Sequence, residues 1–232
     1  MKNQTLIFPD NIDYQQPGHP ALVIDEIEDS ESVKYMINQI QKRGFKNPLE
    51  GFVTLGEVEK YLFDKIGSIN NVDEILDEEL VNIFHTIQVW GGKGGRGVYV
   101  RSNGFYENFD IRTYRKLVTR CLNLETHRLI DWVNTVTDWT FESHEGINQF
   151  STSFSTKHVR FWLYNKLKEE TLPILDEVIQ KGFNDIKGNK LSNNQKSLEF
   201  YHKQMIEKSK KENISLLKLE RLLFNHWRNE KG

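Results

Sequence analysis

The amino-acid sequence predicts an all-α protein. Apolar residues recur three and four positions apart through most of the 232 residues, which is the spacing of helices that bury one face. Alternation with a period of two, which is typical of a half-buried strand, appears only in ALVID (21–25) and VYVR (98–101). We therefore expect several amphipathic helices, with one short extended segment after the glycine-rich loop GGKGGRG (91–97).

Cap residues and apolar stripes define the expected helices. Ser30 precedes a stripe in 30–43, and Thr54-x-x-Glu57 forms a capping box that opens a helix closed by Gly67. Leu219 and Leu223 lie on one stripe of a long terminal helix. In order, the expected helices cover 30–43, 54–67, 72–90, 108–121, 124–138, 146–168, 173–183 and 192–229.

Composition indicates a folded protein of the cytoplasm. Hydrophobic residues make up 38% of the chain, with five Trp and fourteen Phe, which is far from a disordered composition. A single cysteine, Cys121, excludes an internal disulfide and suits a reducing compartment. The N-terminus lacks a signal peptide's apolar core, and no apolar run approaches the roughly 18 residues of a membrane helix. Seven His and one Cys show no metal-ligand spacing, so we expect no metal and no cofactor.

Charge is unevenly distributed although the net charge is only −2. Residues 1–86 hold 7 Lys/Arg and 16 Asp/Glu, residues 87–120 hold 7 and 2, and residues 151–232 hold 16 and 10. We divide the chain into an acidic N-terminal helical region (1–70) and a helical domain (71–232). A polyanion could bind the basic segments, whereas solvated lysines on helix surfaces are the plainer interpretation.

The glycine-rich loop is not a nucleotide-binding motif. It contains G-x-G-x-x-G, but a dinucleotide fingerprint follows a buried strand, and here a helical pattern precedes it. A Walker loop needs Ser or Thr after its lysine, and Gly94 follows Lys93. Two interpretations remain: a plain turn between helices, or a loop that binds phosphate groups through its exposed backbone amides and two cations. The residues of that phosphate-binding loop are Gly92, Lys93, Gly94, Gly95 and Arg96.

Residues 153–176, SFSTKHVRFWLYNKLKEETLPILD, resemble the helix-hairpin-helix DNA glycosylases, particularly the 8-oxoguanine glycosylase branch. In that branch a catalytic Lys follows the hairpin and a catalytic Asp comes nineteen residues later, as Lys157 and Asp176 do here. The resemblance covers about residues 70–230. It implies a two-lobed helical fold that acts on double-stranded DNA, with Ser155, Thr156, His158 and Arg160 among the DNA-binding residues.

Two departures from the family pattern concern the hairpin. The family's hairpin reads Leu-Pro-Gly-Val-Gly, whereas SFST has no glycine, and Pro173 lies three residues before the Asp instead of two. Both departures concern the binding of DNA by the hairpin more than the roles of Lys157 and Asp176. The glycine-rich loop could supply part of that binding.

The chemistry of base excision suits this pair of residue types. A carboxylate stabilises the positive charge that develops on the sugar, and a neutral amine attacks C1′, expels the base and leaves a Schiff base. Cationic neighbours such as His158 and Arg160 would help Lys157 to lose its proton. The plainer alternatives are a solvated lysine at a helix start and an aspartate cap for DEVIQKGF.

A second class of function remains open at this stage. A catalytically silent module of the same fold would bind nucleic acid or a protein partner, and phage defence is one setting for it. The acidic N-terminal region would then serve as a docking lobe for the protein partner.

Overall fold

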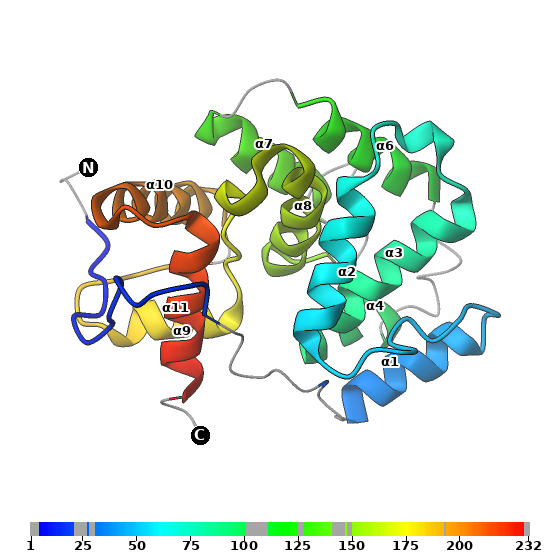
Figure 1. Ribbon diagram of the computed structural model, residues 1–232, viewed down its shortest axis with the longest axis horizontal. Helices are drawn as coiled ribbons and strands as arrows, with labels where there is room; N and C mark the ends of the chain where they lie inside the picture. Colours follow the sequence, from blue (N-terminus) through cyan, green and yellow to red (C-terminus); the bar gives the residue numbers. More distant parts are fainter. Residues whose placement is uncertain are drawn as a thin grey trace.

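The computed structural model describes residues 5–20, 27, 31–100, 111–124, 128–140, 147, 150–192 and 194–229. Every regular element in this part of the chain is a helix, so the all-α prediction is confirmed (Figure 1). The longer helices are α1 (Glu31–Gln41), α2 (Leu55–Gly67), α3 (Asp77–Trp90), α6 (Ile111–Leu122), α7 (Leu129–Trp139), α8 (Thr152–Leu167), α9 (Glu177–Asp185), α10 (Gln195–Glu212) and α11 (Leu216–Asn229). Short helical turns are η1 (Val72–Glu74), η2 (Gly92–Arg96), α4 (Gly97–Val100) and η3 (Lys168–Glu170).

Helix α8 occupies the middle of the molecule. It packs against α2, α3, α6 and α7, while α11 packs against α9 and α10 (Figure 1). The N-terminal segment lies beside α10, where the amide of Leu6 donates to Gln204 Oε1 at 2.8 Å. Helix α8 lies between the α2–α3 side and the α9–α11 side, and residues from both sides surround its N-terminal part (Figure 1).

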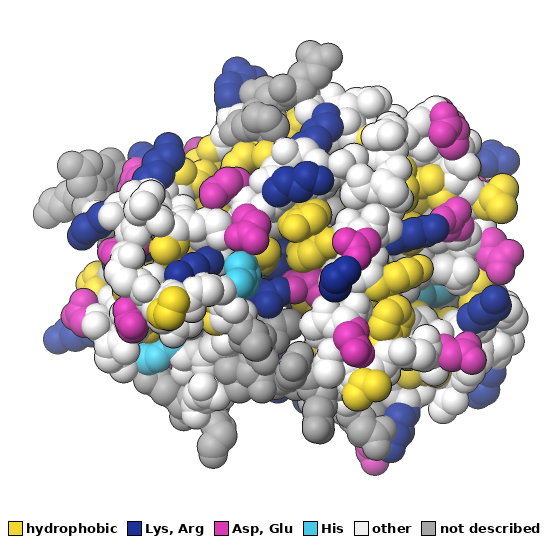
Figure 2. Space-filling view, viewed as in Figure 1, with side chains coloured by type: hydrophobic (Ala, Val, Ile, Leu, Met, Phe, Trp, Pro, Cys, Tyr) yellow, Lys and Arg dark blue, Asp and Glu magenta, His cyan; other side chains and the backbone are white. Residues whose placement is uncertain are grey.

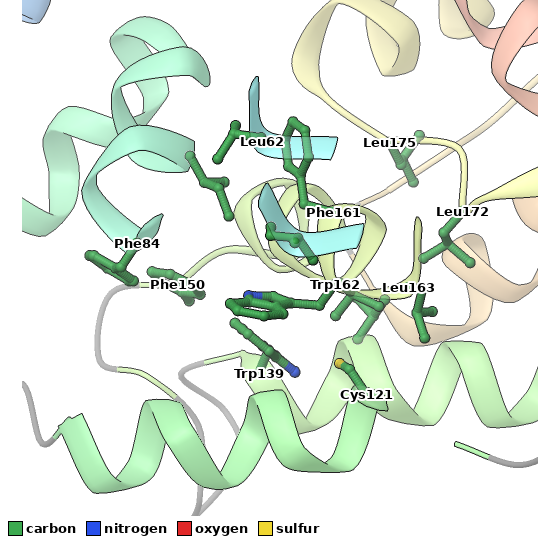
Figure 3. Close-up of a cluster of buried hydrophobic side chains, with 14 of the residues drawn as sticks. Leu62, Phe84, Cys121, Trp139, Phe150, Phe161, Trp162, Leu163, Leu172 and Leu175 are labelled. Atoms are coloured by element: carbon green, nitrogen blue, oxygen red, sulfur yellow. The ribbon is translucent and has the colours of Figure 1, made fainter. Parts of the chain in front are cut away.

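The core is one cluster of buried side chains that includes residues from both 1–70 and 71–232. Trp162 and Phe161 project from α8 into it, Trp162 beside Trp139 and Phe161 beside Leu62 (Figure 3). Phe84 lies further out, next to Phe150, and Trp139, Leu62 and Phe84 come from three other helices. Each of these side chains is fully buried. The large rings on α8 therefore fix that helix against its neighbours on several faces.

The capping box is confirmed. Thr54 Oγ1 accepts the amide of Glu57 at 3.1 Å, and Glu57 Oε2 accepts the amide of Thr54 at 3.0 Å. Helix α2 ends at Gly67, as expected. The expected cap Ser30 lies outside the described residues.

Two expected helices are each divided in the structure. The stretch 72–90 begins as η1, is extended at Ile75 and Leu76, and continues as α3. The stretch 192–229 breaks after Glu212, because Asn213 adopts a left-handed conformation with φ 53° and caps α10. Asparagine tolerates that region better than most residues, and the turn lets α11 fold back on α10.

The expected extended segment after the glycine-rich loop is wrong. Residues Gly97–Val100 form the helical turn α4. Val98 and Tyr99 are both buried, whereas neighbouring residues of a half-buried strand would point to opposite faces. The Tyr99 hydroxyl lies 2.7 Å from His85 Nδ1 on α3, which holds the turn against that helix. ALVID lies outside the described residues.

Candidate active site

A pocket of about 600 Å³ opens beside the N-terminal part of α8. One wall is the end of α3 and the start of η2, with Trp90, Gly91 and Lys93. Lys157 and Asp176 line the same pocket from α8 and from the start of α9. The two residues that the sequence pairs, nineteen positions apart, therefore face one cavity.

Lys157 is a buried lysine. Its exposed fraction is 7%, and Nζ donates to the carbonyl oxygen of Gly91 at 3.3 Å and stands 4.6 Å from the centroid of the Phe154 ring. Burial lowers the pKa of Lys157, the negative charges of Asp176 and Glu220 act against that shift, and the positive charge of Arg160 adds to it. The interpretation of Lys157 as a solvated lysine is wrong.

Asp176 is the N-cap of α9. The chain is extended there, and Oδ1 accepts the amide of Ile179 at 3.0 Å. Because a carboxylate at a helix N-terminus interacts favourably with the helix dipole, the cap holds this charge in place. The expected aspartate cap is confirmed, and the same carboxyl group lines the pocket beside Lys157.

Four of the expected DNA-binding residues lie in the interior, which corrects the prediction for them. Ser155, Thr156, His158 and Arg160 are at most 1% exposed. Side chains buried to this degree cannot reach a phosphate in this conformation. Their assignment failed because α8 is packed on several faces, whereas the sequence suggested a hairpin exposed to DNA.

His158 belongs to the aromatic core and not to the pocket. Nδ1 lies 3.2 Å from the Tyr114 hydroxyl and Nε2 lies 3.2 Å from Gln88 Nε2. Burial, followed by the charge of Lys157, keeps the pKa of His158 well below its usual value. His158 is therefore neutral, and the expectation that it lends positive charge to Lys157 is wrong.

The glycine-rich loop is a compact helical turn with one side on the pocket. Gly92 has φ 70°, which favours glycine. Lys93 is exposed and lines the pocket, whereas Arg96 lies with its guanidinium carbon 4.9 Å from the centre of the Tyr35 ring on α1. Gly94 and Gly95 complete η2. The two cations that the sequence groups together therefore have different surroundings.

Sequence reasoning missed a buried ion-pair network behind the pocket. Arg160 donates from Nη1 to Glu220 Oε1 at 2.7 Å and from Nη2 to Glu59 Oε1 at 3.0 Å, and Arg221 also pairs with Glu59. Glu59 follows Val58 and Glu220 follows Leu219, both buried positions. The sequence does contain a signal for this network, because carboxylates at the edge of an apolar stripe are rarely buried without a basic partner.

Comparison of the chain with protein-family models, curated proteins and solved structures finds no match. Among the helices of the described segments, none has the length and apolar character of a membrane span. Within those same segments, no group of three or more His, Cys, Asp or Glu side chains is placed to hold a metal ion.

Proposed function

We propose that this protein is a DNA glycosylase that excises a damaged or modified base, of the 8-oxoguanine type, from double-stranded DNA in the cytoplasm. The observation that carries the proposal is the pairing of Lys157, whose pKa is lowered by burial, with Asp176 in one pocket. A lysine with a perturbed pKa and a nearby charge partner in a cleft is typical of active sites. The pocket volume of about 600 Å³ lies in the range of small-molecule sites, and a flipped nucleoside is a ligand of that size.

In the proposed reaction the neutral Nζ of Lys157 attacks C1′ of the flipped nucleotide. The bond from C1′ to the base breaks, and the base leaves with the electron pair and takes up a proton. Asp176 stabilises the positive charge on the sugar while that bond breaks. Opening of the sugar ring then moves a proton to O4′ and leaves C1′ joined to Nζ as a Schiff base, from which strand cleavage follows.

Borohydride trapping tests this proposal directly. Reduction of the Schiff base would link the protein covalently to duplexes that carry 8-oxoguanine or an abasic site. Lys157→Gln should abolish trapping and leave duplex affinity within about fivefold, because a buried amine contributes at most one phosphate contact. Lys166→Gln is the matched control, since Lys166 lies on the same helix but is exposed. Trapping of the Lys157→Gln protein at the wild-type level would refute the assignment.

A catalytically silent module is the second candidate. The hydrogen bond from Lys157 Nζ to the Gly91 carbonyl favours it, because that bond gives the buried amine a structural role. Such a module would bind nucleic acid, or would bind a protein through its acidic N-terminal region, with phage defence as one setting. Duplex binding without trapping by the wild-type protein on either substrate would select this candidate.

A further inference from the structure

The backbone just before the N-cap of α9 is held by three buried side chains. Tyr201 donates its hydroxyl to the Ile174 carbonyl at 3.0 Å, and His202 Nε2 lies 3.0 Å from the Pro173 carbonyl, which can only accept. The amide of Ile174 donates to Glu220 Oε2 at 2.8 Å. Three neighbouring backbone groups in the interior are thus paired with side chains from α10 and α11 instead of with a helix or sheet.

Glu220 also connects this segment to α8. One carboxylate oxygen accepts the Ile174 amide, and the other accepts Nη1 of Arg160 at 2.7 Å. Arg160 is three residues after Lys157, so the two side chains leave α8 within one turn of each other. A second, smaller cavity, which shares Lys157 and Asp176 with the pocket, is also lined by Arg160 and Glu220.

We infer that Glu220 is the positioning residue of this site, which fixes the segment that carries Asp176 against the turn of α8 that carries Lys157. This inference rests on the proposed function for its meaning, since the distance between amine and carboxylate matters for glycosidic cleavage. Glu220 itself needs no contact with DNA. It acts through the Ile174 amide on one side and through Arg160 on the other.

The charge of Glu220 has a second effect at the site. The groups that act on the Lys157 amine are Asp176 and Glu220, which raise its pKa, and Arg160, which lowers it, while the neighbouring His158 is neutral. Burial raises the pKa of Glu220, whereas the charge of Arg160 and the Ile174 amide act against that shift. Where Glu220 is ionised, removing its charge lowers the pKa of Lys157 and makes the amine neutral at lower pH. A residue that served packing alone would leave that titration unchanged.

Glu220→Gln and Glu59→Gln form a matched pair of variants. Both remove one buried carboxylate that binds Arg160, so both weaken the same ion-pair network. In the contacts described above, Glu59 bonds to Arg160 and Arg221 and not to the segment before Asp176. Any difference between the two variants therefore reports the link from Glu220 to that segment and to Lys157.

Two measurements on the whole protein, neither of which needs DNA, test the inference. The first is hydrogen exchange at the Ile174 amide, which should become roughly tenfold faster in Glu220→Gln, because a charged acceptor is replaced by a neutral one. The second is reductive methylation of Lys157 by formaldehyde and cyanoborohydride, followed by peptide mass spectrometry as a function of pH. Its midpoint should move to lower pH in Glu220→Gln, and Glu59→Gln should match the wild type in both measurements.

The inference is overturned if Glu220→Gln matches the wild type in both measurements, or if Glu59→Gln changes both by the same amount. Should Glu220→Gln not fold, Glu220→Asp keeps the charge but shortens the side chain by one methylene. It should speed exchange at Ile174 and leave the methylation midpoint near that of the wild type, whereas Glu59→Asp should change neither. Unchanged exchange in Glu220→Asp would also count against the inference.

Failure of the proposed function gives a different pattern. A wild-type protein that is never trapped on DNA, together with the expected shifts in Glu220→Gln, would refute the lysine-dependent reaction proposed above and leave the positioning of Lys157 and Asp176 intact. Trapping by the wild type, with no change in Glu220→Gln, would refute only the role of Glu220.

Discussion

Replacement of Gly91 by Ala tests why the chain has glycine where α3 meets the pocket. A Cβ at this position would lie 2.7 Å from Cε1 and 3.0 Å from Cζ of Phe154. Carbon atoms in contact normally lie about 3.5–4.0 Å apart, so the ring must move by roughly 1 Å. The backbone at Gly91 has φ −67°, which alanine adopts without strain. The Cβ would also lie 3.3 Å from the Gln88 carbonyl oxygen, so the effect comes mainly from the closer contact with the Phe154 ring.

The direction in which the Phe154 ring moves decides whether Gly91→Ala affects the reaction or only the stability of the fold. The ring lines the pocket, and the pocket is where space is available. It also lies beside Lys157, whose Nζ stands 4.6 Å from its centroid and donates to the carbonyl of Gly91 itself. A displacement of about 1 Å in a reacting group can reduce a rate by on the order of 10²-fold. The overpacking costs about 1–3 kcal/mol, from which the lower backbone entropy of unfolded alanine recovers about 0.4–1 kcal/mol.

We therefore expect Gly91→Ala to slow borohydride trapping by about 10- to 100-fold while Tm falls by only a few degrees. The control is Gly97→Ala, since a Cβ on Gly97 meets no atom within 4 Å. That variant should keep the wild-type trapping rate. Wild-type trapping by Gly91→Ala, with Tm also unchanged, would show that Phe154 yields freely and that Gly91 does not support the geometry of Lys157.

Two further predictions concern the glycine-rich loop and pH. Lys93→Ala should reduce the magnitude of the slope of log affinity for duplex DNA against log salt by about 0.9, because it removes one cation at the pocket. Arg96→Ala removes a cation that lies over the Tyr35 ring and should change the slope much less. Equal effects of the two variants would refute that distinction. Burial lowers the pKa of His85 to about 3 and that of His202 to about 4, so both are neutral when folded and take up protons on unfolding below about pH 6.5. The free energy of unfolding should fall between pH 6.5 and 4.5, by up to about 1.4 kcal/mol per pH unit for each histidine. Urea unfolding across that range measures it, and a flat profile would contradict it.

The helices were predictable where one local signal decided them. Thr54 and Glu57 are three residues apart and satisfy each other's backbone, so the start of α2 follows from the sequence. The break at Asn213 was not predictable in the same way, because apolar spacing continues across it. Asparagine in a left-handed conformation is a common helix end, but the same residue is tolerated inside helices, and only the packing of α11 on α10 selects the turn.

The candidate site was also predictable only in part. Lys157 and Asp176 could be paired from the sequence by their order and separation, and both line one pocket. The electrostatic environment of the pair could not be predicted, since Glu220 lies 44 positions from Asp176 in the sequence and meets the site only through the Ile174 amide and Arg160. Contacts of this kind depend on how three helices meet, and no local pattern records them.

The distribution of charge on the surface differs from what the count of charged residues along the sequence suggests. Residues 151–232 carry 16 Lys/Arg and 10 Asp/Glu, which favours a basic surface. Arg160 is buried against two carboxylates, and Lys181 and Lys208 each pair with a glutamate four residues away. On the face in Figure 2, basic and acidic side chains are interspersed among the described residues. Such a surface attracts a polyanion less than a surface of one sign does. Duplex binding would therefore depend on the few cations at the pocket, which among the described residues include Lys93, Lys181 and Arg228.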